Sequence, residues 1–143
     1  MRNILLIIYL SLTPIFVATA ATDIDSMECV LAKMPSGDRL VKLDELASDK
    51  GQGLDYKYYA DRLLKEAELS KDDTYKGNAL FQIIRYYYSR NIDSMHFFIK
   101  KAEPIYLAQK RYEDLCRVKG WYIYALSSNG EKERVLELSL IHI

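Results

Sequence analysis

Apolar residues recur every three or four positions along most of this chain, and the pattern resumes after each short polar turn. Such spacing places the apolar side chains on one face of a helix. Helices are therefore predicted over residues 23–32, 38–48, 55–70, 74–89, 94–109 and 112–127, and a further one begins at residue 131. Strand-like alternation does not persist, and glycine (6) and proline (3) are scarce. The predicted fold class is all-α, with antiparallel helical hairpins joined by short turns.

The clearest hairpin spans residues 73–109. Asp72 or Asp73 is expected to cap its first helix, and Asp93 its second, because a carboxylate accepts hydrogen bonds from the first free backbone N–H groups. Pro104 lies inside the second helix. It lacks a backbone donor, so we expect it to kink the helix or split it near residues 101–103.

Hairpins of this length, repeating about every forty residues, indicate an α-solenoid. Residues 38–137 resemble tetratricopeptide repeats: Tyr86 matches the aromatic residue of a first helix, Met95 the small residue that opens the second, and Ala102 a later alanine. In the next unit Tyr124 matches the aromatic residue, and Asn129 and Gly130 match the turn between helices. The resemblance implies a tetratricopeptide-like solenoid, here incomplete at the C-terminus.

Residues 1–20 have the organisation of a signal peptide. Arg2 precedes an uncharged apolar run over residues 4–17, and Ala18-Thr19-Ala20 forms a small-residue cleavage site. The alternative is an uncleaved membrane anchor, because residues 4–21 approach the minimum length of a membrane span. We favour cleavage and an exported, periplasmic protein, with attachment to the inner membrane left open. Residues 21–37 then form a short N-terminal segment before the repeats.

The last six residues, 138–143, read Leu-Ser-Leu-Ile-His-Ile. This hexapeptide is the translation of the mosaic-end adapter used in transposon-based sequencing libraries. We interpret it as an adapter-derived artefact that interrupts the helix beginning at residue 131; the alternative is a genuine apolar end of that helix.

Charge and reactive residues argue against several classes of function. Lys+Arg and Asp+Glu are 20 each, so no basic field indicates nucleic-acid binding. His96 is the only histidine outside the suspect tail, and no spacing of His, Cys or paired acids predicts a metal site. No catalytic or cofactor-binding motif is present, so neither catalytic residues nor cofactors are predicted. Cys29 and Cys116 are read as free or buried thiols, with a disulfide as the alternative.

The aromatic residues are the better indication of function. Three consecutive helical residues point about 100° apart, so the side chains of residues 86–88 cannot all face one core. At least one is expected on a groove or on the outer face, where it can bind a partner. The simpler alternative is that each ring packs between helices. The candidate partner-binding residues are Arg85, Tyr86, Tyr88, Lys119, Trp121 and Tyr124. The basic residues among them favour an acidic or carboxylate-ended ligand.

These features predict a non-catalytic scaffold that binds a protein or peptide. Exported regions of this appearance resemble the N-terminal sensor halves of bacterial membrane signalling proteins. In those proteins a membrane span and a histidine kinase or helix-turn-helix output domain follow. A free-standing periplasmic adaptor, or the non-catalytic part of an enzyme whose catalytic domain lies downstream, are the alternatives.

Overall fold

The computed structural model describes residues 24–49 and 55–140. The whole predicted leader, residues 1–20, and the last three residues of the suspect tail lie outside this part. Contact clustering divides the chain into two units, Met1–Arg39 and Leu40–Ile143. In the first unit residues 24–33 are helical, and the chain bends at Met34, whose carbonyl accepts a hydrogen bond from Arg39 Nη2 at 3.1 Å.

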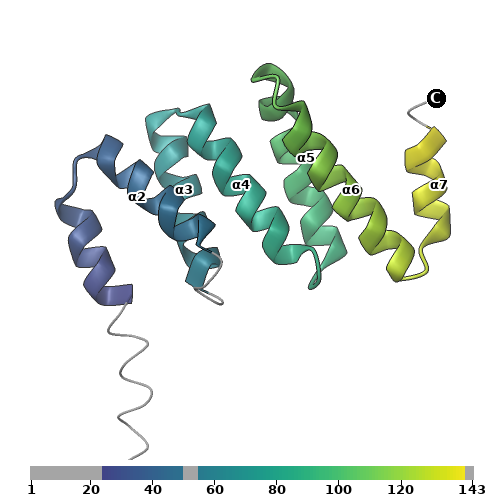
Figure 1. Ribbon diagram of the computed structural model, residues 1–143, viewed down its shortest axis with the longest axis horizontal. Coiled ribbons are helices and arrows are strands. Elements are labelled where there is room, and N and C mark those ends of the chain that lie inside the picture. The colour runs from purple at the N-terminus through teal and green to yellow at the C-terminus, as the bar shows by residue number, and fades with distance from the viewer. Residues whose placement is uncertain (1–23, 50–54, 141–143) are drawn as a thin grey trace, which may run out of the picture. The chain divides into compact units, whose positions relative to one another are not determined.

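The described residues contain helices and no strand, so the all-α prediction is confirmed. The helix α2 (Ser36–Ser48) begins in the first unit and runs into the second. The second unit continues with α3 (Asp55–Ser70), α4 (Asp73–Tyr87), α5 (Ile92–Ala108), α6 (Tyr112–Ser128) and α7 (Lys132–Leu140), as Figure 1 shows. None of the described helices is long and apolar enough to cross a membrane.

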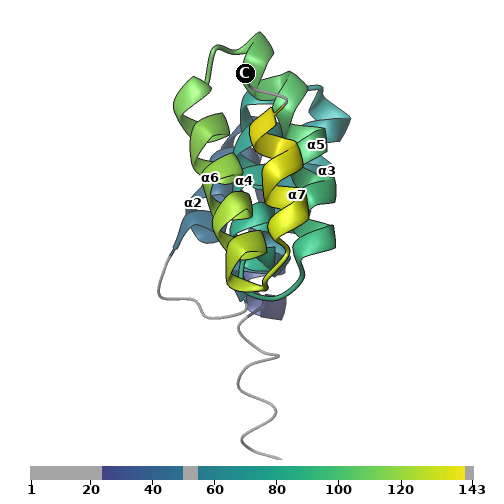
Figure 2. The same cartoon turned by 90° about the vertical axis from the view of Figure 1, so that its right-hand side faces the viewer.

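The helices of the second unit lie in two layers. Figure 2 shows α4 and α6 on one side and α3, α5 and α7 on the other. A core of apolar side chains fills the space between α4, α5 and α6. Its members include Leu80, Ile84, Met95, Ile99, Ala102, Tyr106, Val118, Tyr122 and Leu126. Within each helix they recur at the three- or four-residue spacing from which these helices were predicted.

Three helices end with the same hydrogen-bonded closure. A residue two or three positions after the helix donates its backbone N–H to a carbonyl five residues earlier: Asp72 to Ala67 at 2.9 Å, Arg111 to Tyr106 at 2.8 Å and Glu131 to Leu126 at 3.0 Å. The residue immediately before each donor takes a positive φ: Lys71 (56°), Lys110 (57°) and Gly130 (78°). This closure satisfies carbonyls at the helix end and reverses the chain within a few residues. It produces the antiparallel repeat.

Helix starts agree with the prediction at α4 and differ at α5. Asp72 Oδ1 accepts from the backbone N–H groups of Thr74 at 2.9 Å and Tyr75 at 3.2 Å, so the predicted cap is confirmed. The prediction of Asp93 as a cap is wrong. Asn91 has extended backbone angles, and its Oδ1 accepts from Ser94 N at 2.8 Å. Asparagine caps a helix as well as aspartate does, which leaves Asp93 in the first turn, near the positive end of the helix.

The helix α5 is continuous from Ile92 to Ala108, with Pro104 inside it, so the predicted split does not occur, and the alternative, a kink at the proline, stays a prediction. Ala102 and Tyr106, two residues to either side of the proline, are both fully buried. Packing of this segment on both sides of the ring outweighs the one backbone hydrogen bond that proline cannot make. At the other end of the chain, α7 continues through residues 138–140.

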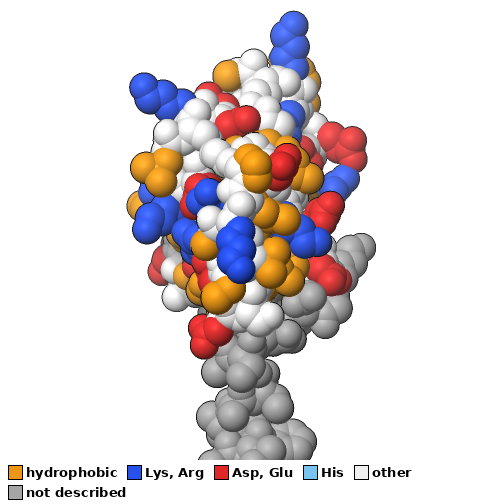
Figure 3. Space-filling model, turned by 90° about the vertical axis from the view of Figure 1, so that its left-hand side faces the viewer, with side chains coloured by type: hydrophobic (Ala, Val, Ile, Leu, Met, Phe, Trp, Pro, Cys, Tyr) orange, Lys and Arg blue, Asp and Glu red, His pale blue; other side chains and the backbone are white. Residues whose placement is uncertain are grey.

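Charged side chains of both signs are mixed over the face seen in Figure 3. Apolar side chains lie among them, and neither sign forms a continuous field on that face. This distribution agrees with the equal numbers of acidic and basic residues, 20 of each, in the sequence.

Candidate functional site

The three consecutive tyrosines, residues 86–88, point toward three different helices. The ring of Tyr86 lies 6.0 Å from that of Tyr56 on α3, and the ring of Tyr87 stacks 5.6 Å from that of Phe98 on α5. The ring of Tyr88 lies 5.9 Å from the indole of Trp121 on α6. All three are half-buried, as the 100° spacing of helical residues requires. Only Tyr88 turns toward the surface that α4 and α6 share.

Four aromatic side chains meet on that surface, and we call them the aromatic strip: Phe81 from α4 and Tyr88 from its C-terminal cap, and Trp121 and Tyr124 from α6. Ring centroids are 5.3 Å apart for Phe81 and Trp121, 5.9 Å for Tyr88 and Trp121, and 6.2 Å for Tyr88 and Tyr124. The first three rings rest partly buried on the core, whereas Tyr124 is 64% exposed. The strip therefore presents a firmly supported aromatic surface to solvent.

A hollow lies at each end of the strip. One, with a volume of about 610 Å³, is bounded by Tyr88, Tyr124, the α4–α5 turn and the end of α6. The other, about 220 Å³, lies between α2, α4 and α6 next to Phe81, and we call it the polar hollow. Its lining residues are Asp44, Ser48, Asn78, Phe81, Gln82, Arg111, Asp114 and Arg117.

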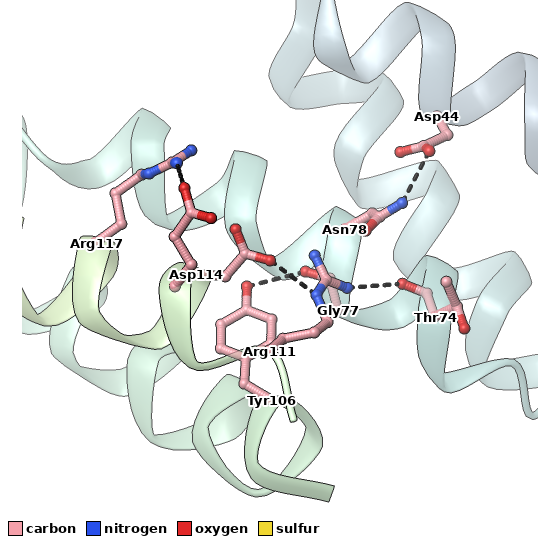
Figure 4. A network of polar contacts seen from close by, with 9 residues as sticks. Asp44, Thr74, Gly77, Asn78, Tyr106, Arg111, Asp114 and Arg117 are labelled. Atoms are coloured by element: carbon pink, nitrogen blue, oxygen red, sulfur yellow. Dashed lines mark hydrogen bonds and ion pairs between the residues drawn. The ribbon is translucent and has the colours of Figure 1, made fainter. Parts of the chain in front are cut away.

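Two hydrogen bonds join α2 to α4 in the polar hollow. Asn78 Nδ2 donates to Asp44 Oδ2 at 2.9 Å, as Figure 4 shows, and Gln82 Nε2 donates to Ser48 Oγ at 3.3 Å. Gln82 is only 8% exposed, and its Oε1 has no hydrogen-bond partner among the described residues. Burial raises the pKa of the Asp44 carboxyl, and the Asn78 hydrogen bond and the Arg111 charge only partly offset this.

The wall of this hollow is held by Arg111, which reaches from the start of α6 to α4. Its Nε donates to Asp114 Oδ2 at 2.8 Å and its Nη1 to the Thr74 carbonyl at 3.4 Å (Figure 4). Beneath it, the fully buried Tyr106 donates its hydroxyl to the Gly77 carbonyl at 3.0 Å. A Cβ on Gly77 would lie 2.7 Å from Arg111 Nη1 and 3.3 Å from Tyr106 Cε1, so a larger residue here would displace the end of the Arg111 side chain and crowd the Tyr106 ring.

The structure brings together only some of the predicted partner-binding residues. Tyr86 faces α3. The guanidinium carbon of Arg90, from the turn between α4 and α5, lies 4.3 Å from the Tyr86 ring centroid. The Arg85 guanidinium carbon lies 4.6 Å from the ring centroid of Tyr56, and Lys119 forms an ion pair with Glu103 of α5. The residues that do meet are Tyr88, Trp121 and Tyr124.

Phe81, Asp44 and Gln82 did not emerge from the sequence analysis as site residues. The spacing of Phe81 and Tyr88, seven positions apart on one helix, carried a usable signal, because it places both on one face. The two pairs that join α2 to α4, Asp44 with Asn78 and Ser48 with Gln82, are each 34 residues apart. A search for complementary polar residues at a repeat-length offset would have found them.

A further hollow, about 430 Å³, lies between α5, α6 and α7. The His96 ring stacks on Tyr122 with 4.8 Å between centroids, and Arg134 Nη2 donates to Tyr122 Oη at 2.9 Å. Burial, together with the charges of Lys100 and Arg134, lowers the pKa of His96. Within residues 24–49 and 55–140, no three His, Cys, Asp or Glu side chains are placed to hold a metal ion.

Cys29 and Cys116 are exposed free thiols. The interpretation of the two residues as free thiols agrees with this placement, and neither belongs to the aromatic strip or the polar hollow.

No protein-family model, curated protein or solved structure matches this chain.

Proposed function

We propose that this chain is a non-catalytic helical-repeat scaffold that binds a protein or peptide partner on the aromatic strip. The observation that carries the proposal is the contact of Phe81, Tyr88, Trp121 and Tyr124 across α4 and α6, with Tyr124 64% exposed. Aromatic side chains supply large contact areas with few rotatable bonds, and they concentrate binding energy at protein interfaces.

The size of the surface fits a short extended segment. Asn78 and Tyr88 are ten residues apart on α4, which corresponds to about 15 Å along the helix. An extended peptide covers that distance with about five residues. The hollows at both ends of the strip give such a segment room for side chains larger than those that the flat rings alone accept.

The wider context that we propose is the exported sensor part of a larger signal-transduction protein. The signal-peptide pattern of residues 1–20 and the tetratricopeptide resemblance of residues 38–137 support it. The gene sequence downstream of residue 137 separates this proposal from its alternatives. A membrane span followed by a histidine kinase or helix-turn-helix domain supports a sensor, further repeats and a stop codon support a free-standing adaptor, and a catalytic motif supports an enzyme.

Selection from a random-peptide display library tests the binding proposal. Immobilised wild-type chain is the target, and a Trp121→Ala/Tyr124→Ala double variant is the comparison. Enriched peptides are synthesised with a fluorescent label, and their affinities are measured by anisotropy. Phe97→Ala is the matched control, because Phe97 is also exposed, at 54%, but lies on α5 and outside the strip.

We expect peptides that bind the wild-type chain and the Phe97→Ala variant alike and bind the double variant at least tenfold more weakly, a loss of about 1.4 kcal/mol or more. Circular dichroism verifies that the double variant is folded. Equal affinity for all three proteins, or failure to enrich any peptide, would contradict the proposed role of the strip.

A further inference from the structure

One side chain that lines the polar hollow carries a hydrogen-bond acceptor for which the described residues supply no donor. Gln82 is only 8% exposed, and its Oε1 is buried without a hydrogen-bond partner among the described residues. A buried amide oxygen without a donor destabilises the free protein. A ligand that supplies a donor to this oxygen would remove that cost.

The charges around the hollow point in the same direction. The Asp44 side chain has no cationic partner within ion-pair distance in the described part of the chain; it accepts only from Asn78. The two arginines of the hollow are already committed, Arg111 to Asp114 and Arg117 to Glu113. Of the charged groups here, an acid is therefore the one left open.

The basic residues that had favoured an acidic ligand do not line this hollow. Lys119 pairs with Glu103 on α5, and the Arg85 guanidinium lies over the Tyr56 ring on the side of α3. The hollow is lined by the partly exposed Asp44 carboxylate and by the Gln82 side chain, whose buried Oε1 lacks a donor, and such oxygen acceptors favour a ligand that carries N–H donors.

We propose that the polar hollow binds a cationic side chain of the partner, a lysine or arginine, between Asp44 and Gln82, while an apolar residue of the same segment packs on the aromatic strip. This inference rests on the proposed function and specifies the chemistry of its partner. A lysine ammonium or arginine guanidinium carries several N–H donors, so it can satisfy the Asp44 carboxylate and Gln82 Oε1 together.

Helix geometry sets the spacing of the two recognised residues. Gln82 and Tyr88 are six residues apart on α4, about 9 Å along the helix. In an extended segment, about three residues span that distance. The cationic and apolar residues of the partner are therefore three positions apart.

Capped hexapeptides with this spacing provide the test. One reads Gly-Phe-Ser-Ser-Lys-Gly and another Gly-Lys-Ser-Ser-Phe-Gly, which covers both chain directions. Each has matched versions in which norleucine or glutamate replaces lysine. They are titrated into ¹⁵N-labelled protein, and the signals of the Trp121 indole and of the Asn78 and Gln82 side-chain amides are followed.

We expect a lysine peptide in at least one direction to bind tenfold or more tightly than its norleucine version, and the glutamate version to bind more weakly still. Asp44→Asn keeps the acceptor for Asn78 but removes the charge, and it should cancel the preference for lysine. Gln82→Met should weaken lysine binding and leave the free protein at least as stable as the wild type. Asp61→Asn, which alters a 53% exposed carboxylate on α3, is the matched control and should change nothing.

Equal binding of lysine and norleucine peptides, with shifts at Trp121, would overturn the inference and leave the proposed function standing. Unchanged lysine preference in both Asp44→Asn and Gln82→Met would overturn it as well. So would the absence of binding in both chain directions, whereas the proposed function would then be judged by its own display selection.

Discussion

Replacement of Tyr106 by phenylalanine removes one oxygen atom from the connection between α5 and α4. The Tyr106 side chain is fully buried, and its hydroxyl donates to the Gly77 carbonyl at 3.0 Å. The ring keeps its place in phenylalanine, so no large cavity forms. A hydrogen bond of this kind contributes about 1 kcal/mol net to stability. The Gly77 carbonyl lies in a helix interior and keeps its helical partner, so the loss should stay near that value rather than reach the cost of an orphaned group.

Thermal unfolding followed by circular dichroism measures this loss. For a chain of this size, about 1 kcal/mol corresponds to a fall in Tm of about 3–5 °C. Tyr112→Phe is the control, because that side chain is 57% exposed, and it should leave the unfolding midpoint unchanged. If Tyr106→Phe is as stable as the wild type while the control behaves as expected, the hydroxyl does not stabilise the α4–α5 pairing and this account of the pairing is wrong.

Three further predictions concern stability. Gly77→Ala should destabilise the protein by about 1 kcal/mol, because crowding against Tyr106 exceeds the gain in helix propensity. Gly120→Ala has open space around its Cβ position and should stabilise the protein by up to about 1 kcal/mol. Thermal unfolding of both variants gives the signs of the two changes, and equal signs would contradict the close approach at Gly77. Asp72→Ala should cost about 1 kcal/mol in urea unfolding through loss of the α4 cap, and a change near zero would mean that the cap is not formed. Because the pKa of His96 is lowered in the folded protein, the unfolded chain takes up a proton first as pH falls. The stability present above about pH 6.5 should therefore decline through the mildly acidic range. His96→Gln should flatten that decline in urea midpoints measured across pH, and an unchanged slope would refute the lowered pKa of His96.

The helices and their buried faces could be predicted from the sequence because one physical rule governs both. Leu80, Ile84, Met95 and Ile99 recur at helical spacing, and each is almost wholly buried. The cap at Asp72 was likewise readable from residue type and position. The turns at Lys71 and Lys110 were not, because lysine has no preference for the positive φ that both adopt. Their conformation follows from the closure of the preceding helix, which depends on how the next helix packs.

The candidate site was predictable in part. Helix geometry alone indicated that the three tyrosines of residues 86–88 diverge, but not which one faces α6. Tyr86 and Tyr88 were both predicted to bind a partner, yet one faces α3 and the other Trp121. That choice depends on the packing of neighbouring helices. The lack of a donor for Gln82 Oε1 could not be predicted for the same reason, since it depends on which side chains the folded helices place around it.

Site-directed photo-crosslinking tests the central claim, partner binding on the aromatic strip, most directly. A benzoyl-phenylalanine replaces Tyr124, which is 64% exposed and lies at the edge of the strip, and in a second protein it replaces Phe97, which is 54% exposed on α5. Each is irradiated with a peptide selected by display on the wild-type chain, and the products are mapped by mass spectrometry. We predict crosslinks from position 124 that excess unlabelled peptide suppresses, and none from position 97. Crosslinks from position 97 but not from position 124 would show that the partner binds elsewhere and would contradict the account.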